Sequence, residues 1–183
     1  MPWTRDITNG SLAHTGTTRD FWLVHDDVPA RAQITAGLAR IADKVMVCVR
    51  SSGDGRTCFE VGVDGPVLLI RQIEFGNTIA TVAQVAHSIA ADTAYAVRVR
   101  LDANAEGNAT IAATAGVSGG TEVTCSHTSN TNLAYTFRTG VASAVDGATV
   151  NTFEKATLED QIVTFGEMRS EEHTSKLQSL TNL

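Results

Sequence analysis

The chain has 183 residues, of which 43% are apolar and 19% are charged, and its formal charge is −6. This apolar fraction excludes a disordered chain, and the net acidity argues against a general nucleic-acid binder and a polybasic membrane anchor. No apolar run approaches the roughly 20 residues of a membrane-spanning helix. The length allows one ordinary domain that buries a core without disulfides or metals. Threonine and valine occur 24 and 18 times, which favours β-structure.

Short strand-like runs, separated by turn residues, follow one another from residue 11 to about residue 157. Residues 44–50 read KVMVCVR, a nearly continuous apolar run that predicts a strand covered on both faces. Asp64-Gly65 predicts a tight hairpin turn between two alternating strands. The strands expected in this half of the chain are residues 21–24, 32–38, 44–50, 57–63, 67–73 and 78–85.

The clearest alternation in the second half is YAVRVRL, residues 95–101. Tyr95, Val97, Val99 and Leu101 fall on one face and two arginines fall on the other, as in one sheet of a β-sandwich. We therefore expect these four side chains to point into the core. The further strands expected are residues 108–115, 121–127, 133–141 and 148–157. No helix pattern or fixed-period repeat interrupts the series, so the sequence predicts an all-β, antiparallel, two-sheet sandwich.

The order of these strands resembles the concanavalin A-like/laminin-G-like jelly-roll superfamily. KVMVCVR, a polar turn and a strand ending in the Asp64-Gly65 hairpin are similar to the first part of that pattern. YAVRVRL and a glycine-led closing pair between residues 140 and 154 are similar to its end. The resemblance covers residues 11–158 and implies one jelly-roll domain over residues 1–160.

Residues 161–183 form a C-terminal tail outside this pattern. Residues 169–179 read RSEEHTSKLQS, which resembles the translation of a common sequencing adapter at all but one position, Lys176. We therefore expect residues 169–183 to be non-native, the product of a faulty gene model from metagenomic reads. The native C-terminus is then lost near residue 168, and His173 is no site candidate. The alternative is a genuine polar helix.

Three cysteines, Cys48, Cys58 and Cys125, leave at least one thiol unpaired within a monomer. Cys48 and Cys58 flank a hairpin turn, and a one-residue change of register decides whether they face each other or lie on opposite faces. We expect all three to be free, small core residues, with a Cys48–Cys58 disulfide as the alternative. No zinc-type C-x-x-C spacing is present.

The resemblance implies two kinds of chemistry to test. Retaining glycosidases of this superfamily carry Glu-x-Asp-x-x-Glu on one strand, because their paired carboxylates must lie about 5–5.5 Å apart. The nearest pair here is Glu60 with Asp64, which sits in a turn, so we expect no enzyme. Lectin-like sandwiches also hold Ca²⁺ at loop oxygens, and Asp26, Asp27 and Asp54 are the candidate ligands. Solvated turn carboxylates are the alternative, and no other cofactor is expected.

Aromatic side chains, which stack on sugar rings, are scarce. Phe21 and Trp22 are adjacent on one strand and should point to opposite sides of it. Trp3 lies in the N-terminal lead and is expected to be a free contact residue, whereas Tyr135 and Phe137 are expected in the core. Four histidines are expected to be solvated, in or near turns: His14, His25, His87 and His127.

These observations predict a non-catalytic β-sandwich that acts as a binding or structural module. Small laminin-G-like proteins occur among phage virion and tail components, so the resemblance implies contact with a glycan or a neighbouring virion subunit, and not with nucleic acid or membrane. The alternative is a carbohydrate-binding module of a secreted carbohydrate-active protein, truncated by the faulty gene model. A plain structural sandwich without a ligand is the third hypothesis. The start of the chain lacks a signal peptide, which predicts cytoplasmic synthesis, or secretion if the N-terminus has been trimmed.

Overall fold

The computed structural model describes residues 2–6, 8, 10–25, 28, 31–103, 109–129 and 138–158. These residues form thirteen strands and one short 3₁₀ turn, Ile41–Asp43. The strands are β1 (Trp3–Asp6), β2 (Ser11–His14), β3 (Asp20–His25), β4 (Ala32–Leu38), β5 (Met46–Val49), β6 (Cys58–Asp64), β7 (Val67–Glu74), β8 (Asn77–Ala86), β9 (Tyr95–Ala103), β10 (Ala109–Gly116), β11 (Val123–Ser129), β12 (Thr139–Ser143) and β13 (Thr149–Thr157).

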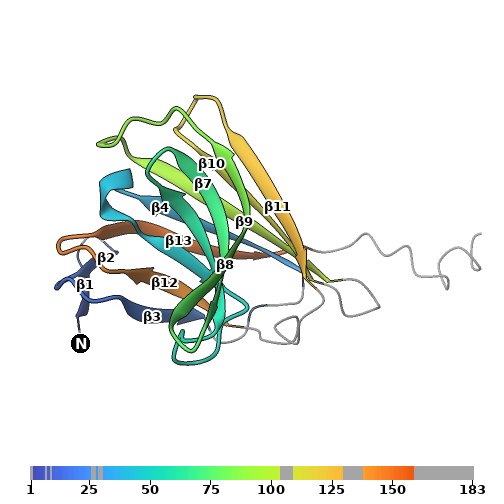
Figure 1. The fold of residues 1–183 in the computed structure, drawn as a ribbon. Coiled ribbons are helices and arrows are strands. Elements are labelled where there is room, and N and C mark those ends of the chain that lie inside the picture. Colours follow the sequence, from blue (N-terminus) through green and yellow to red (C-terminus); the bar gives the residue numbers. More distant parts are fainter. Residues whose placement is uncertain are drawn as a thin grey trace, which may run out of the picture.

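The strands pair antiparallel in two sheets that pack as the layers of a sandwich (Figure 1). One sheet has seven strands in the order β1-β2-β13-β4-β9-β10-β11, and the other has six in the order β3-β12-β5-β6-β7-β8. Strands from the two ends of the chain lie side by side, β2 with β13 and β3 with β12. No helix in the described part of the chain is long and apolar enough to cross a membrane. The predicted all-β, two-sheet antiparallel jelly roll is confirmed.

The core lies between the sheets, where the sequence placed it. Tyr95, Val97, Val99 and Leu101 on β9 are all buried there, as predicted. Their neighbours Arg98 and Arg100 point to the outer face of the seven-stranded sheet, where Arg98 pairs with Glu122 of the loop before β11. Because successive side chains of a strand alternate between faces, this strand fixes the orientation of the whole layer.

The β5–β6–β7 region follows the predicted pattern closely. All four residues of β5 are buried, which agrees with a strand covered on both faces. β6 and β7 form the predicted tight hairpin, with Asp64 opposite Val67 and Gly65 at φ +59°. Phe59, Val61 and Val63 face the core, so the alternation of β6 sends Glu60 to the outer face of the six-stranded sheet.

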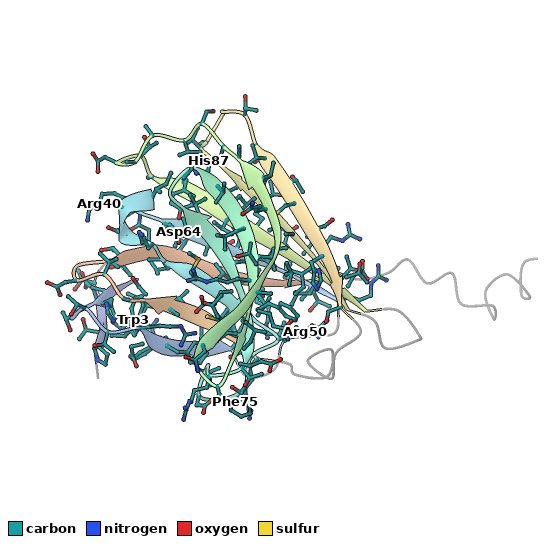
Figure 2. All side chains as sticks on the ribbon, viewed as in Figure 1. Trp3, Arg40, Arg50, Asp64, Phe75 and His87 are labelled. Atoms are coloured by element: carbon teal, nitrogen blue, oxygen red, sulfur yellow. The ribbon has the colours of Figure 1, made fainter. Side chains whose placement is uncertain are left out.

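The N-terminal segment differs from the prediction. Residues 3–6 form strand β1, which the sequence did not indicate, and Trp3 is 2% exposed, so the expectation of a free contact residue is wrong (Figure 2). Its ring lies 4.9 Å from that of His14, and its indole Nε1 donates a hydrogen bond to the Asp20 carbonyl at 3.2 Å. β1 pairs with β2 at the edge of the sheet, and this pairing places Trp3 opposite His14.

The solvated histidines expected from the sequence are also mostly wrong. His14 is fully buried at the end of β2, and its Nδ1 lies 2.9 Å from the Val145 carbonyl oxygen. The half-buried rings of His25 and His127 lie on strands, each 5.9 Å from a phenylalanine ring. His87 follows β8 at a turn, and its Nε2 is 2.9 Å from the Gly65 carbonyl oxygen. Turn-like neighbours in the sequence did not reveal that strands would carry three of the four rings into packed surroundings.

Candidate functional site

A buried carboxylate, Glu60, marks the outer face of the six-stranded sheet. Its side chain is 1% exposed, although no further sheet formed by the described residues stacks on this face. Arg19 donates to Oε1 through Nε at 2.7 Å, and its Nη2 lies 2.6 Å from the same oxygen. Arg71 donates to Oε2 through Nε at 2.7 Å. A buried carboxylate is tolerable only when it is paired and hydrogen-bonded in this way. Burial has the largest single effect on the pKa of Arg19 and lowers it, but the charge and hydrogen bond of Glu60, together with Cys48 and Cys58, outweigh burial and leave that pKa raised.

The two arginines lie on the same face of the sheet and reach Glu60 from either side of β6. Arg71 lies directly opposite Glu60 in the β6–β7 register. Arg19 immediately precedes β3, and β12 and β5 lie between β3 and β6 in the sheet, so the contact between the Arg19 and Glu60 side chains spans these two strands. Arg19 Nη2 also donates to the Gly55 carbonyl at 3.1 Å, which fixes the β5–β6 loop above the face.

A groove with a volume of about 320 Å³ opens above this ion cluster. Its charged lining comprises Arg19, Lys44, Glu60, Asp64 and Arg71, and residues 142–145 form one wall. Lys44 Nζ lies 3.1 Å from Asp64 Oδ1, and Arg71 Nη1 lies 3.8 Å from Asp64 Oδ2. The groove therefore presents several oriented N–H donors and carboxylate acceptors within a small space. Asp64, one of the lining residues, is labelled in Figure 2.

A larger cavity, of about 620 Å³, lies over the outer face of the seven-stranded sheet. Gly37, Ala96 and Gly116, in one row across that sheet, line it together with the loop at residues 117–120. Its ion pair, Arg98 with Glu122, has side chains that are 41% and 44% exposed. Such exposed pairs are weakly held in water, so we favour the smaller groove with the buried carboxylate as the candidate site.

Comparison with known proteins places the fold but not a sequence family. No protein-family model matches the chain, and no curated protein sequence matches it. Sheep galectin-11, solved in complex with glycerol, superposes with a TM-score of 0.52 at 7% identity, over 75% of this chain and 98% of the galectin chain. The fold is a concanavalin A-like jelly roll.

A second solved structure with this fold is a tail fibre protein from an E. coli phage. It superposes with a TM-score of 0.52 at 13% identity, over 82% of this chain and 21% of the tail fibre chain. At these low identities, the galectin and the tail fibre protein show a shared fold and no more. In this jelly roll, Glu60 is held by two arginines, and Asp64 at the end of β6 shares Arg71 with it.

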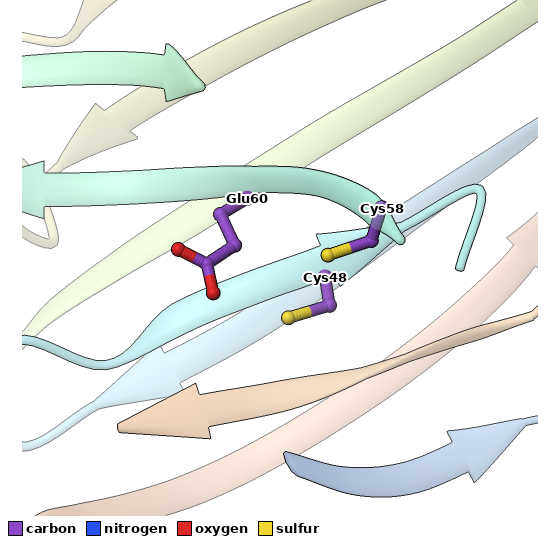
Figure 3. Close-up of side chains that lie close together, drawn as sticks. All are labelled: Cys48, Cys58 and Glu60. Atoms are coloured by element: carbon purple, nitrogen blue, oxygen red, sulfur yellow. The ribbon is translucent and has the colours of Figure 1, made fainter. Parts of the chain in front are cut away.

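Cys48 and Cys58 lie beside Glu60 under the same face (Figure 3). The two Sγ atoms and a Glu60 oxygen lie within 4.8 Å of one another, and all three residues are buried. The observed register places Cys48 opposite Glu60, so both thiols share one face, and the predicted free state of all three cysteines is confirmed. Phe21 packs over this pair.

The charges around the two thiols disfavour a metal ion. Burial raises the pKa of the Cys48 thiol well above its usual range, with further contributions from Cys58 and Glu60. A metal would need thiolates, and it would have to compete with two arginines for the Glu60 oxygens. We therefore regard Cys48 and Cys58 as packing residues that form the floor beneath Arg19.

The calcium ligands expected from the sequence are only partly within the described residues. Asp26 and Asp27 lie outside them. Asp54 is described, and its Oδ1 accepts hydrogen bonds from Ser52 Oγ at 2.6 Å and from the Arg56 amide at 3.0 Å. These bonds lower the pKa of the Asp54 carboxyl and cap its own turn. Within the described part of the chain, Asp54 joins no cluster of three metal-ligating side chains, and calcium binding stays a prediction.

Sequence reasoning missed Arg19, Lys44 and Arg71 as site residues. The alternation of β6 gave a signal for Glu60, an acidic residue between the apolar Phe59 and Val61. Nothing in the sequence indicated that a basic residue 41 positions earlier would lie against it.

Proposed function

We propose that this protein is a non-catalytic glycan-binding module and that the groove above Glu60 is its binding site. The carrying observation is the buried carboxylate held between Arg19 and Arg71 on the outer face of the six-stranded sheet. Sugar hydroxyls both donate and accept hydrogen bonds, so a site that recognises them needs donors and acceptors fixed in place. The ion cluster supplies both kinds, with its geometry set before a ligand arrives, and fixed geometry reduces the entropy cost of binding.

Stability alone gives a weak reason for this cluster. Replacing a buried ion pair by apolar residues of similar volume is often neutral or stabilising, because the charges lose hydration. A binding role accounts for groups that are both buried and directed at a groove. The shared fold with a galectin and a phage tail fibre protein supports the proposal only by analogy, since folds of this kind host several functions.

The test is a glycan array probed with the full chain, with and without Ca²⁺, beside two variants. Glu60→Gln removes the central charge at nearly constant shape and should abolish binding, while Arg100→Gln, on the other sheet, should leave it unchanged. Circular dichroism confirms that each variant is folded. Absence of binding to any glycan, or equal binding by Glu60→Gln, would refute the proposal. A requirement for Ca²⁺ would support the predicted calcium site.

A second candidate function, contact with a neighbouring virion subunit, is favoured by strand β8. It forms the edge of the six-stranded sheet and reads NTIATVAQVA, without a charged residue. Phe75, in the turn before it, is 76% exposed, and Ile79 is 56% exposed. Charges, proline and β-bulges commonly prevent edge strands from pairing with other chains. β8 has two register shifts against β7 but neither a charge nor a proline.

A further inference from the structure

We propose that the groove above Glu60 selects acidic sugars, with a ligand carboxylate bound by the Arg19 and Arg71 guanidinium groups. This inference rests on the proposed glycan-binding function and names its ligand class. Three features support it: the excess of positive charge in the groove, the unused N–H donors of the two arginines, and the weak pairing of Arg71 with Asp64.

The groove is positively charged in an acidic protein. Its lining holds three cations, Arg19, Lys44 and Arg71, against the two carboxylates of Glu60 and Asp64. One positive charge is therefore in excess, whereas the whole chain carries a net charge of −6. A local excess of one sign in a concave surface attracts ligands of the opposite sign.

Both arginines keep donors for a ligand after binding Glu60. A guanidinium has five N–H donors in one plane. Arg71 uses Nε for Glu60, and Arg19 uses Nε and Nη2 for Glu60 and Gly55. Their side chains are 24% and 27% exposed, and both line the groove. Planar guanidinium groups match a carboxylate in a two-bond arrangement, which a neutral hydroxyl cannot reproduce.

Asp64, the second carboxylate of the groove, pairs only weakly with Arg71. Asp64 Oδ2 lies 3.8 Å from Arg71 Nη1, beyond hydrogen-bond distance, while Lys44 holds the other oxygen at 3.1 Å. Glu60, in contrast, is fixed by contacts of 2.6 to 2.7 Å on both oxygens. Glu60 thus orients the two arginines. Arg71 Nη1 is only weakly paired, so it can donate to a ligand carboxylate.

The experiment is calorimetric titration of the full chain with tri-galacturonic acid and with its fully methyl-esterified form. The ester keeps the shape of the sugar and removes its charge. We expect the acid to bind at least tenfold more tightly, with an affinity that falls as salt rises, because salt screens partly exposed charges. Sodium acetate at the same concentration is expected not to compete, since it lacks the sugar.

Two variants locate the selectivity, with Arg100→Gln as the control for loss of a remote positive charge. Lys44→Asn removes one cation, and asparagine suits the φ of +44° at this position. It should weaken acid binding several-fold without changing ester binding. Arg19→Lys keeps the charge but loses the planar donors, and it should reduce the preference for the acid.

The outcomes separate this inference from the proposed function. Equal binding of the acid and the ester, or tighter binding of the ester, overturns the acidic-sugar inference and leaves glycan binding intact. Effective competition by acetate reduces the site to a general anion site and also overturns it. Binding of neither ligand overturns the inference, while the array with neutral glycans then decides the function separately.

Discussion

Cys48 is a single residue whose burial has a measurable consequence. Its thiol lies on the outer face of β5, beneath Phe21, and is fully buried. Burial raises its pKa well above the ordinary value, and the neighbouring Cys58 and Glu60 raise it further. The folded protein therefore keeps the Cys48 proton at a pH where the unfolded chain releases it.

The sign of the pH dependence follows from this raised pKa. The Cys48 contribution to stability is fully present below the ordinary cysteine pKa of about 8.5 and is lost as pH rises above it. At pH 9.5 the loss in the free energy of unfolding from one such thiol is about 1.4 kcal/mol at most.

Urea unfolding under reducing conditions at pH 7.5 and 9.5 should show this decrease, and Cys48→Ala should show less of it. Cys125, which is only half-buried, provides the matched Cys125→Ala control, with a smaller change in slope. An identical pH slope for the parent and Cys48→Ala would contradict the assignment.

At the scale of elements, Gly140 on β12 allows the edge strand β3 to pack closely. A Cβ at this position would overlap the Trp22 carbonyl oxygen and the Phe21 ring. Gly55, with φ +67°, leaves room for the same ring from the β5–β6 loop. The two glycines thus hold Phe21 over Cys48 and Cys58, next to the Arg19 side chain.

We expect Gly140→Ala to destabilise the fold by about 1–3 kcal/mol, the usual effect of overpacking. The carbonyl oxygen belongs to the backbone and cannot rotate away. Gly37→Ala on β4 is the control, because its Cβ would meet only the Thr152 hydroxyl, at 2.5 Å, and that side chain can change rotamer. Urea denaturation of both variants measures the difference. Similar unfolding free energies for the two variants would mean that β3 does not pack on β12 as described.

The elements themselves show how far sequence patterns reach. β4, β6 and β9 were predictable because their residues alternate between the two faces, and β7 because the Asp64-Gly65 turn pairs it with β6. β1 was not, since WTRD has four residues, a single large apolar side chain and no alternation. Trp3 became a core residue only through pairing of β1 with β2, a long-range event that no local pattern reports.

The candidate site was less predictable than the fold for the same reason. Alternation placed Glu60 on the face opposite to Phe59 and Val61, but it could not show that this face is covered. The cover comes from Phe21 on β3 and from Arg19 just before it. β3 joins this sheet by pairing with β12, which lies near the other end of the chain. Residues 26, 27, 135, 137 and 159–183 lie outside the described residues, so the calcium ligands, two core aromatics and the non-native tail stay predictions.

At the scale of the whole molecule, the two sheets differ in how their edges are protected. Threonine and serine dominate the exposed side of β11, the edge of the seven-stranded sheet, and Glu122 precedes it. The edge strand of the six-stranded sheet, β8, is ten residues long, and its first five residues, 77–81, are all exposed. An uncharged edge with unpaired backbone groups can extend its sheet with a strand of a second chain.

We therefore expect the full chain to self-associate through β8 and to do so more as its concentration rises. Ile79→Lys places a charge in the middle of the exposed half of this strand and should return the protein to monomer, because lysine on an edge opposes pairing. Thr124→Lys on β11 is the matched control at the other sheet edge and should leave association unchanged. Sedimentation velocity over a hundredfold concentration range measures all three proteins. A parent chain that stays monomeric throughout, or association that Ile79→Lys does not alter, would remove the support that β8 gives to a subunit-contact role, and glycan binding would then be the sole remaining function proposed for this jelly roll.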